Sequence, residues 1–308
     1  METFKIGICE PDHFSKRALD LLSTIGEVRC FEGDDLPAFI CDQNALFVRL
    51  KYQIDDALLQ NASRLRYICS PTTGLNHISC TRPNITVLSL KGEYAFLETI
   101  RATPEHIFGL TLSLLRNYAH AFLNPQNAVF NRDPYRGYEI YGSTVGIIGL
   151  GRVGRILAGY FTAFGARVRY FDVQPKSCDT AEPCDSVEQL IDASDIVILC
   201  ANYTPKNADM IDKKHFERMQ GKYFVNAARG ELVHEADLLN FLQKDWFRGV
   251  AVDVLAHETS ASGFLQNLLP LVKTRNLIVT PHIGGATFSS MQRTEEFIAA
   301  KLVAAIGK

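Results

Sequence analysis

Short apolar runs alternate with stretches of helical spacing from one end of the chain to the other, a pattern that predicts an α/β fold with parallel sheets. In the first hundred residues the expected strands are Phe4–Cys9, Ala45–Val48, Tyr67–Cys69 and Thr86–Leu88. The expected helices between them include Ser15–Thr24 and Ile54–Asn61. The second carries Asp55 and Asp56 in its first turn, where the helix dipole favours carboxylates.

A second α/β series begins at Ser143 and contains six expected strands. They are Val145–Ile148, Val168–Phe171, Ile196–Cys200, Tyr223–Asn226, Gly249–Val252 and Leu277–Thr280. Six strands separated by helices match a doubly wound nucleotide-binding sheet. We therefore predict two Rossmann-like or flavodoxin-like domains with doubly wound parallel sheets.

The domain boundaries follow from two helices. Thr103 is a suitable N-cap before Pro104, and together they open a helix that runs to about Asn117. A loop-like segment, 124–141, comes next. The last expected helix, about Ser290–Ile306, follows the second sheet without a strand of its own, and the pattern alone leaves open whether it returns to the first domain. If that helix does return, the first domain is discontinuous and comprises 1–102 plus 286–308, and the nucleotide-binding domain comprises 103–285; the family resemblance described below implies this arrangement, with the first domain as the substrate domain.

Composition excludes several classes of protein. A length of 308 residues suits two domains, and 47% hydrophobic with 21% charged residues is ordinary for a globular chain. The net charge of −2 gives no footprint for nucleic acid or an anionic membrane. We expect no signal peptide and no membrane span, because the apolar runs are far shorter than about 18 residues. The eight cysteines lack metal-binding spacing, so we expect no metal and a cytoplasmic location.

A glycine-rich turn follows the first strand of the second series, where residues 149–154 read GLGRVG before helical spacing resumes. Gly149 allows a tight turn, Gly151 lets the backbone approach a pyrophosphate, and Gly154 permits close packing of helix on strand. The helix N-terminus adds free N–H groups and a partial positive charge. Taken alone, such a motif is as well explained by a plain tight turn, so its context decides.

That context contains an acidic residue in the expected place. Asp172 ends the next strand, 18 residues after Gly154, where a carboxylate accepts hydrogen bonds from adenosine ribose hydroxyls. The same carboxylate would repel the extra phosphate of NADP. We predict NAD as the cofactor. The preference over NADP is the weaker part of this prediction, because Arg167 and Arg169 are close in sequence.

Polar residues follow three later strands of the same series: Arg229, Glu258 and His282. Ligands of open α/β sheets bind at the carboxyl ends of strands, so one shared site is expected. Each residue also has an ordinary explanation, as an ion-pair partner, a solvated charge or a hydrogen-bonded histidine. Their joint occurrence beside a nicotinamide site favours the functional interpretation.

From about residue 45 to 290 the chain resembles the D-isomer-specific 2-hydroxyacid dehydrogenases, and in particular phosphoglycerate-dehydrogenase-like members of unassigned substrate. The resemblance is carried by GLGRVG, NAARG, AVDV followed by Glu258, and TPHIGG. It implies an oxidoreductase that interconverts a 2-hydroxy acid and its 2-oxo acid. Arg229 would bind the substrate, His282 would act as acid and base, and Glu258 would orient His282.

The resemblance also implies the remaining site residues and a homodimer joined through the cofactor domain. The cofactor contacts that we expect are Gly149, Gly151, Arg152, Val153, Gly154, Asp172, Ala227, Asp253, Gly284 and Gly285. A glycine turn in the first domain, with Thr73 and Gly74, would bind the substrate carboxylate. Arg49 is a further candidate for the substrate, and a surface position explains it equally well.

Two departures from the family pattern bear on this assignment. Thr259 and a serine-rich stretch follow Glu258, where the family has Glu-Pro. The segment Leu90–Arg101 is longer and more charged than usual, so Lys91, Glu93 and Arg101 either select a larger acid or form a solvated hinge.

Two other functions stay open. A formate or phosphite dehydrogenase shares this fold, although Glu258 argues against the formate enzymes, which carry an amide there. An NAD-sensing binding protein without turnover is the alternative from a different class.

Overall fold

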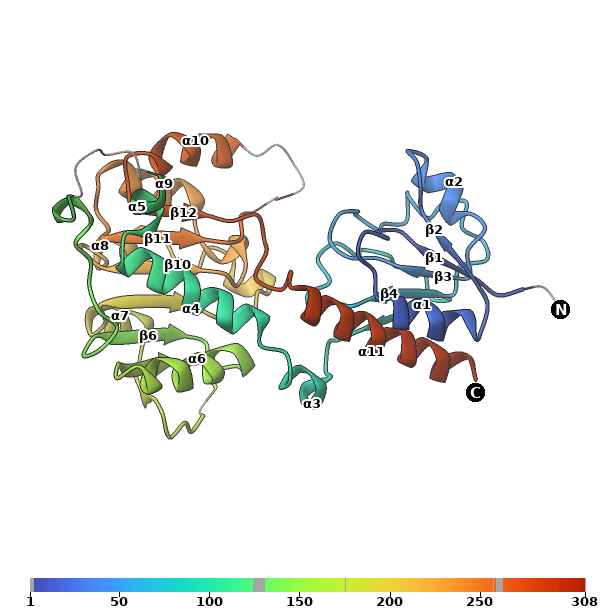
Figure 1. Cartoon of the computed structure of the whole chain (residues 1–308), viewed down its shortest axis with the longest axis horizontal. Coiled ribbons are helices and arrows are strands. Elements are labelled where there is room, and N and C mark those ends of the chain that lie inside the picture. The colour runs from blue at the N-terminus through green and yellow to red at the C-terminus, as the bar shows by residue number, and fades with distance from the viewer. Residues whose placement is uncertain (1–2, 124–130, 175, 257, 259–262, 308) are drawn as a thin grey trace. The chain divides into compact units, whose positions relative to one another are not determined.

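The structure is a computed structural model that describes residues 3–123, 131–174, 176–256, 258 and 263–307. The chain divides into two compact units, one of Met1–Ile100 with Ala286–Lys308 and one of Arg101–Gly285. These divisions lie within two residues of those that the sequence predicts. Each unit is built on one parallel sheet (Figure 1), which confirms the predicted fold class.

The first unit contains a five-stranded sheet in the order β2-β1-β3-β4-β5. The strands are β1 (Lys5–Ile8), β2 (Glu27–Cys30), β3 (Ala45–Phe47), β4 (Tyr67–Ser70) and β5 (Thr86–Ser89). Its helices are α1 (Lys16–Ser23), α2 (Leu36–Ile40), α3 (Tyr94–Leu97) and α11 (Phe288–Ile306). This strand order is that of flavodoxin-like folds, whose ligands bind beyond the carboxyl ends of the strands.

Helix α11 completes the core of the first unit, although it comes from the other end of the chain. It packs against α1 and buries Ile298, Ala299 and Leu302 (Figure 1). Thr287 caps its first turn by accepting a hydrogen bond from the backbone N–H of Ser290. The return of the last helix, which the pattern left open, is thus present in the structure.

The second unit contains a seven-stranded sheet in the order β12-β11-β10-β9-β6-β7-β8. The strands are β6 (Thr144–Ile148), β7 (Arg167–Phe171), β8 (Glu182–Pro183), β9 (Ile196–Leu199), β10 (Tyr223–Asn226), β11 (Gly249–Val252) and β12 (Leu277–Val279). Strand order reverses between β6 and β9, which creates a crevice at the carboxyl ends of these two strands. All pairings are parallel, so β10, β11 and β12 also end at this edge.

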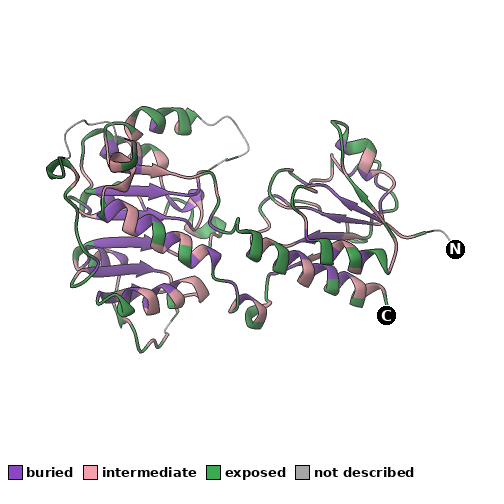
Figure 2. Ribbon diagram, in the orientation of Figure 1, coloured by how far each residue is buried: buried purple, intermediate pink, exposed green. Residues whose placement is uncertain are grey.

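Helices cover both faces of this sheet. They are α4 (Ala102–Leu115), α5 (Tyr118–Leu123), α6 (Arg152–Ala163), α7 (Val187–Asp192), α8 (Lys213–Glu217), α9 (Glu235–Gln243) and α10 (Gly263–Val272), with 3₁₀ turns at Asp133–Tyr135, Pro205–Asn207 and Gly230–Leu232. Consecutive residues of β9 enter different apolar clusters: Ile196 and Ile198 pack in one, Val197 and Leu199 in the other. Figure 2 shows the resulting buried strands. A sheet buried on both faces is typical of doubly wound folds.

The structure corrects two expectations, the helix at 54–61 and the N-cap at Thr103, and adds strand β2. Residues 54–61 are not a helix: Ile54 pairs with Ile78 in a parallel bridge, and a single turn follows. Strand β2 went unpredicted because, at the sheet edge, its residues are exposed or half-exposed and show no apolar run. Helix α4 begins at Ala102 after Arg101, so Thr103 lies inside its first turn and is not the N-cap. Part of the expected loop, 124–130, lies outside the described residues.

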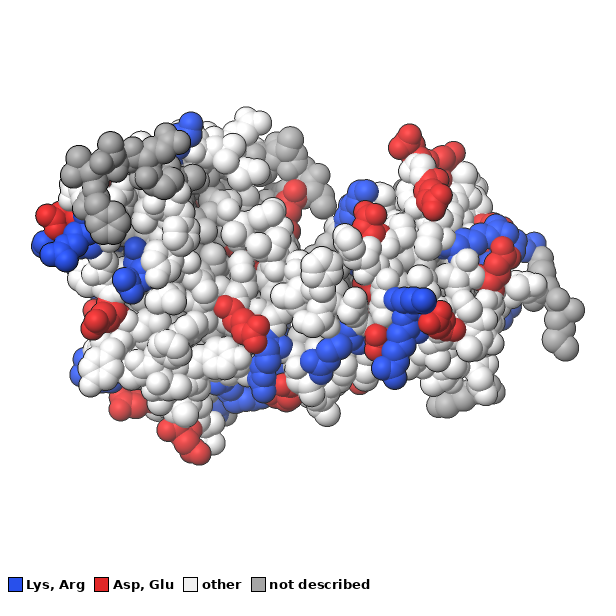
Figure 3. Space-filling model, viewed as in Figure 1, with Lys and Arg blue, Asp and Glu red and all other residues white. Residues whose placement is uncertain are grey.

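The surface carries charges of both signs. In Figure 3, acidic and basic side chains lie side by side in small groups on the face shown. No helix among the described residues is long and apolar enough to cross a membrane. The described part of the chain also contains no group of three or more His, Cys, Asp or Glu side chains arranged to hold a metal ion. All eight cysteines are free thiols.

Candidate active site

The glycine-rich turn lies between β6 and α6 at the crevice of the second sheet. Gly149 has a φ of 99°, and a Cβ there would lie 2.8 Å from the backbone nitrogen of Ala201, which follows β9. A Cβ at Gly154 would overlap the carbonyl oxygen of Gly149. Both positions therefore require glycine, as the sequence predicts.

The same turn leaves room for a phosphate group. A Cβ at Gly151 would meet no described atom within 4 Å. Gly151 is also the N-cap of α6, and no side chain of the described residues caps that helix. The N-terminus of this 12-residue helix thus begins at a position with open space beside its backbone, which fits the pyrophosphate of a dinucleotide. Arg152 and Val153 are the next two residues of the helix and are half-buried.

Asp172 follows β7 and reaches back to the glycine-rich turn. Its Oδ2 accepts hydrogen bonds from the Leu150 N–H at 2.8 Å and from Lys176 Nζ at 2.6 Å, and Oδ1 accepts from the Gln174 N–H. Burial alone would raise the pKa of Asp172, but the Lys176 ammonium and the two N–H groups hold the pKa below its usual value. The carboxylate is therefore ionised and placed as the sequence predicts. Lys176, which the sequence analysis missed, is its charge partner.

Asp253 follows β11 and organises the turn that carries the predicted catalytic histidine. Its buried carboxylate accepts hydrogen bonds from the backbone N–H groups of Ile283 and Gly284, both at 2.9 Å, and from Thr280 Oγ1 at 2.6 Å. His106 Nε2 lies 3.1 Å from the same carboxylate. Burial opposes its ionisation, yet these bonds hold the pKa of Asp253 below its usual value. His106 is a second residue that the sequence analysis missed.

His282 lies at this turn with its ring facing Glu258. The two are joined by a 2.6 Å hydrogen bond between His282 Nδ1 and Glu258 Oε2, and 27% of the His282 side chain is exposed. The backbone of His282 has a φ of 53°, which a non-glycine residue adopts only when its surroundings hold it there. Here its N–H donates to the Asp253 carbonyl at 2.7 Å.

Glu258 is itself held by the backbone after β11. Its Oε1 accepts from the Leu255 N–H at 3.0 Å, and Glu235 fixes the same loop by accepting from the Ala256 N–H. The structure thus brings Glu258 and His282 together as the sequence predicts. Residues 259–262, with the departure at Thr259, lie outside the described residues.

Arg229 belongs to the tight turn after β10. Asn226 spans this turn, accepting from the Ala228 N–H and donating to the Arg229 carbonyl. A Cβ at Gly230 would overlap the backbone at Leu255, so the turn packs directly on the loop that holds Glu258. The half-buried Arg229 donates through Nη1 to the Ala228 carbonyl at 2.6 Å. Ala227 is buried at the start of this turn, and Gly285 closes the second unit after Gly284.

In the first unit, Arg49 is engaged in a structural ion pair. Its guanidinium contacts Glu295 Oε1 at 2.5 Å through Nη2 and at 3.1 Å through Nε, and Glu295 is fully buried. This favours the structural explanation of Arg49 over a substrate contact. The predicted carboxylate turn lies after β4, where Thr72 Oγ1 donates to the Gly74 carbonyl at 2.8 Å and Thr73 is exposed.

The charged segment 90–101 is fastened to one face of α11. Glu93 contacts Lys301 at 2.6 Å, the ring of Phe96 stacks on Phe297 with centroids 4.0 Å apart, and Arg293 donates to Thr99. The three α11 residues are spaced by four, so they lie on one side of the helix. Lys91 and Arg101 are exposed. Glu93 is thus engaged by Lys301 within the first unit, which argues against a substrate contact for Glu93 and also against a freely solvated segment.

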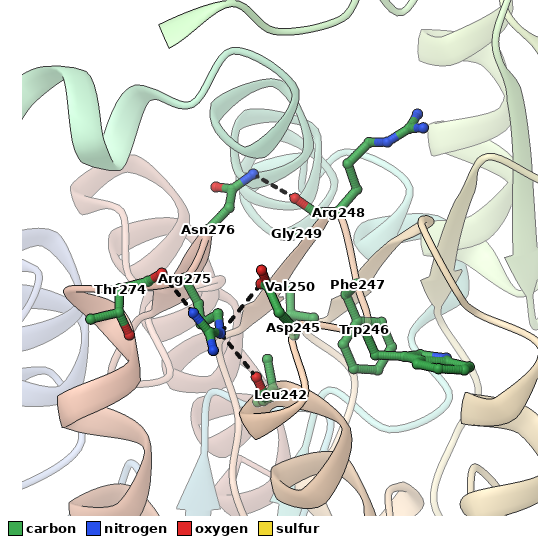
Figure 4. A pocket seen from close by; sticks show the side chains of 10 residues that line it. All are labelled: Leu242, Asp245, Trp246, Phe247, Arg248, Gly249, Val250, Thr274, Arg275 and Asn276. Atoms are coloured by element: carbon green, nitrogen blue, oxygen red, sulfur yellow. Dashed lines mark hydrogen bonds and ion pairs between the residues drawn. The ribbon is translucent and has the colours of Figure 1, made fainter. Parts of the chain in front are cut away.

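A cavity of about 240 Å³ lies at the amino ends of β11 and β12 (Figure 4), the edge opposite the predicted catalytic residues. Arg275 is the most central cation there. It donates to the carbonyls of Leu242, Gln243 and Thr274 and pairs with Asp245. The guanidinium of Arg275 is thus bonded to protein groups, so this cavity offers no cation for a ligand from Arg275. The predicted catalytic residues lie at the opposite edge of the sheet.

The sequence of this chain is similar to those of known dehydrogenases, and the similarity includes the unit that carries the glycine-rich turn. Residues 108–284 match the family model described as D-isomer specific 2-hydroxyacid dehydrogenase, NAD binding domain. The chain is 30% identical over 292 residues to D-3-phosphoglycerate dehydrogenase of Mycobacterium leprae, covering 92% of this chain and 53% of that protein. It is 30% identical over 277 residues to glyoxylate reductase of Pyrococcus furiosus, covering 85% and 79%.

A solved structure shows the same fold. The D-lactate dehydrogenase of Aquifex aeolicus, in complex with NAD and lactic acid, superposes with a TM-score of 0.85 at 24% identity, covering 98% of this chain and 95% of that one. The chain spans about half the length of the mycobacterial dehydrogenases that it matches. With the family model matched across most of the second unit and the cofactor cradle in place, the chain belongs to the D-isomer specific 2-hydroxyacid dehydrogenases.

Proposed function

We propose that this chain is an NAD-dependent dehydrogenase that interconverts a D-2-hydroxy acid and its 2-oxo acid. The observation that carries the proposal is the His282–Glu258 pair, with a 2.6 Å hydrogen bond at the carboxyl edge of the cofactor sheet. A histidine oriented by a carboxylate is the usual arrangement for acid–base catalysis beside a reacting group. The relatives named glyoxylate reductase and D-3-phosphoglycerate dehydrogenase support the same reaction class.

In this proposal His282 handles the proton of the reaction. Because Nδ1 is bonded to Glu258, the other ring nitrogen, Nε2, is the one that serves the substrate. When the oxo acid is reduced, the His282 imidazolium gives its proton to the 2-oxo oxygen and becomes neutral. The bound coenzyme would supply the hydride, two electrons with one proton, that carbon 2 of the substrate accepts. In the reverse direction His282 accepts the hydroxyl proton.

Arg229 supplies the positive charge that the reaction needs. A guanidinium can bind a carboxylate through two parallel hydrogen bonds and can also polarise the neighbouring oxo group. The turn that holds Arg229 packs on the loop of Glu258, which supports a shared site for the two side chains. The backbone turn at Thr73 and Gly74 is the proposed second contact of the substrate carboxylate.

The cofactor would be held by the glycine-rich turn and Asp172 at one end. Toward the nicotinamide, Ala227, Asp253, Gly284 and Gly285 complete the proposed contacts. We also propose a homodimer joined through the second unit, on the resemblance to the family. The eight free thiols support a reducing compartment, the cytoplasm.

The proposal is tested by loss of NADH absorbance with 2-oxo acids graded from glyoxylate to bulky charged acids. We expect turnover with at least one acid. Arg229→Ala and His282→Asn should each lower kcat/KM by about 10²–10⁴-fold, because each removes a group that acts in the transition state. NADH affinity, followed by its fluorescence, should stay nearly unchanged in both variants.

Lys213→Met, which removes an exposed side chain at the start of α8, is the control and should keep full activity. Turnover that survives in both site variants would contradict the assigned roles. NADH binding without turnover of any acid would instead favour a binding protein of the same fold.

A further inference from the structure

The ion pair between Lys176 and Asp172 bears on the choice of coenzyme, and its significance rests on the proposed cofactor site. In doubly wound folds, the carboxylate at the end of the second strand accepts hydrogen bonds from the ribose 2′-hydroxyl of NAD. An unpaired carboxylate at that place repels the 2′-phosphate of NADP, which carries nearly two negative charges. In this chain the carboxylate is paired.

The pairing uses most of the accepting capacity of Asp172. Oδ2 accepts two hydrogen bonds, from Lys176 Nζ and the Leu150 N–H, and Oδ1 accepts one from Gln174. Only 9% of the Asp172 side chain is exposed. An ionised carboxylate offers about four lone-pair sites, so little of it remains for ribose hydroxyls while Lys176 stays bound.

Lys176 is fixed in this position by its own backbone. Its carbonyl oxygen accepts a hydrogen bond from the Tyr170 hydroxyl, and Tyr170 is a buried residue of β7. The ammonium therefore stands beside the carboxylate, and 28% of the Lys176 side chain is exposed to solvent. Its donors remain partly available to an incoming anion, because an ammonium has three N–H groups.

Arg167 and Arg169, which weakened the prediction of NAD over NADP, have other positions and contacts in the structure. Arg167 is exposed at the start of β7, about 13 Å along the strand from its carboxyl end at roughly 3.3 Å per residue. Arg169 pairs with Glu182 of the neighbouring strand at 3.6 Å. Lys176 is the cation that stands at the Asp172 carboxylate.

We propose that Lys176 sets the coenzyme selectivity of this chain by neutralising Asp172, so that a coenzyme with a 2′-phosphate is accepted beside NAD(H). With both charges present, the site is neutral overall, and the ammonium can pair with the 2′-phosphate. With NADH bound, the ribose hydroxyls share Asp172 with Lys176 or displace it. Coenzyme choice thus depends on this one lysine and not on Asp172 alone.

The test is the dissociation constant of NADH and of NADPH, measured by calorimetry without any substrate. For the natural chain we expect the two constants to lie within about tenfold of each other. Lys176→Met should raise the ratio of the NADPH constant to the NADH constant by about tenfold or more, since a lone carboxylate would then face the 2′-phosphate. Lys176→Arg keeps the positive charge, so its ratio of the two constants should stay within about threefold of that of the natural chain.

Lys213→Met removes an exposed lysine of the same unit and serves as the charge-matched control; its ratio should not change. An unchanged ratio in Lys176→Met, with NADH still bound, would overturn the inference and leave the proposed function standing. A natural chain that binds NADH but excludes NADPH by a thousandfold would overturn it as well. Failure to bind either coenzyme would overturn the proposed function together with this inference.

Discussion

At the scale of single residues, the backbone around His282 is held as firmly as its side chain. Asp253 receives four hydrogen-bonding groups, and two of them are N–H groups of the turn that follows His282. A left-handed residue costs about 1–2 kcal/mol, so this turn needs such support to persist. Asp253 therefore holds the turn that carries His282, and its charge matters for stability as well as for geometry.

Asp253→Asn should lower the free energy of unfolding of the second unit by about 2 kcal/mol at pH 7, because an amide group would face backbone N–H donors. The pKa of Asp253 is lowered in the folded chain. Its contribution is thus present above its unfolded pKa of about 3.9 and is lost as the pH falls through the folded value. The free energy of unfolding, measured with urea, should therefore differ less between the natural chain and the variant at pH 3 than at pH 7.

Asp245→Asn is the matched control, because Asp245 is an exposed carboxylate of the same unit. Its effect should stay below about 0.5 kcal/mol at both pH values. If Asp253→Asn lost as much free energy of unfolding at pH 3 as at pH 7, the loss would come from the changed hydrogen-bonding geometry and not from the charge of Asp253.

The residues that sequence reasoning found and those that it missed differ in how far their partners lie along the chain. Gly149 and Gly154 were predictable because a local feature of one turn requires each of them: the positive φ of Gly149, and the closeness of Gly154 to the Gly149 carbonyl oxygen. His106 meets Asp253 across almost 150 residues, and only the fold brings them together. Lys176 lies four residues after Asp172 and could have been noticed, but the spacing alone does not show that its ammonium contacts the Asp172 carboxylate.

At the scale of elements, strands buried on both faces were predictable and elements with mixed exposure were not. The central strands β6, β9, β10 and β11 are continuous apolar runs and matched the pattern closely. Residues 54–61 have the spacing of a helix, yet the bridge between Ile54 and Ile78 commits the backbone to an extended start. Tertiary pairing thus outweighed local propensity there.

The ion pair of Arg49 and Glu295 joins the end of β3 to α11, and its loss should show a distinct pH dependence. Burial raises the pKa of Glu295, although the Ser15 N–H and Arg49 oppose that shift. Arg49→Met should cost about 3–5 kcal/mol at neutral pH, because a buried charge is left without its partner. Without Arg49 the pKa of Glu295 should rise further, so the stability of the variant should fall as the pH rises above the unfolded glutamate pKa of about 4.3, because the ionised carboxylate is then buried without a partner.

Arg17→Met is the control for this prediction. Arg17 also pairs with a carboxylate of α11, Glu296, but at 3.8 Å and with 85% of its side chain exposed. Such surface pairs contribute at most about 1 kcal/mol. Equal losses for the two variants, or a loss for Arg49→Met that does not grow with pH, would count against a buried charge at Glu295.

At the scale of the whole molecule, the chain crosses between its two units twice, near Ile100 and again near Gly285. The second unit is therefore continuous, and the first depends on a helix made from the last residues of the chain. Helix α11 contributes Ile298, Ala299 and Leu302 to a cluster with strand residues such as Ile6 and Phe47. Folding of the first unit thus requires both ends of the sequence.

A chain truncated after Gly285 should consequently keep the second unit folded and lose the first. Burial of a large apolar side chain contributes about 1.5–3 kcal/mol, so losing Ile298 and Leu302 alone removes about 3–6 kcal/mol from a domain of marginal stability. Hydrogen exchange should show protected amides in β6 and β9 but rapid exchange in β1 and β3. NADH binding should survive, because the glycine-rich turn and Asp172 belong to the continuous unit. Protection of β1 and β3 in the truncated chain would mean that the first sheet is stable without α11.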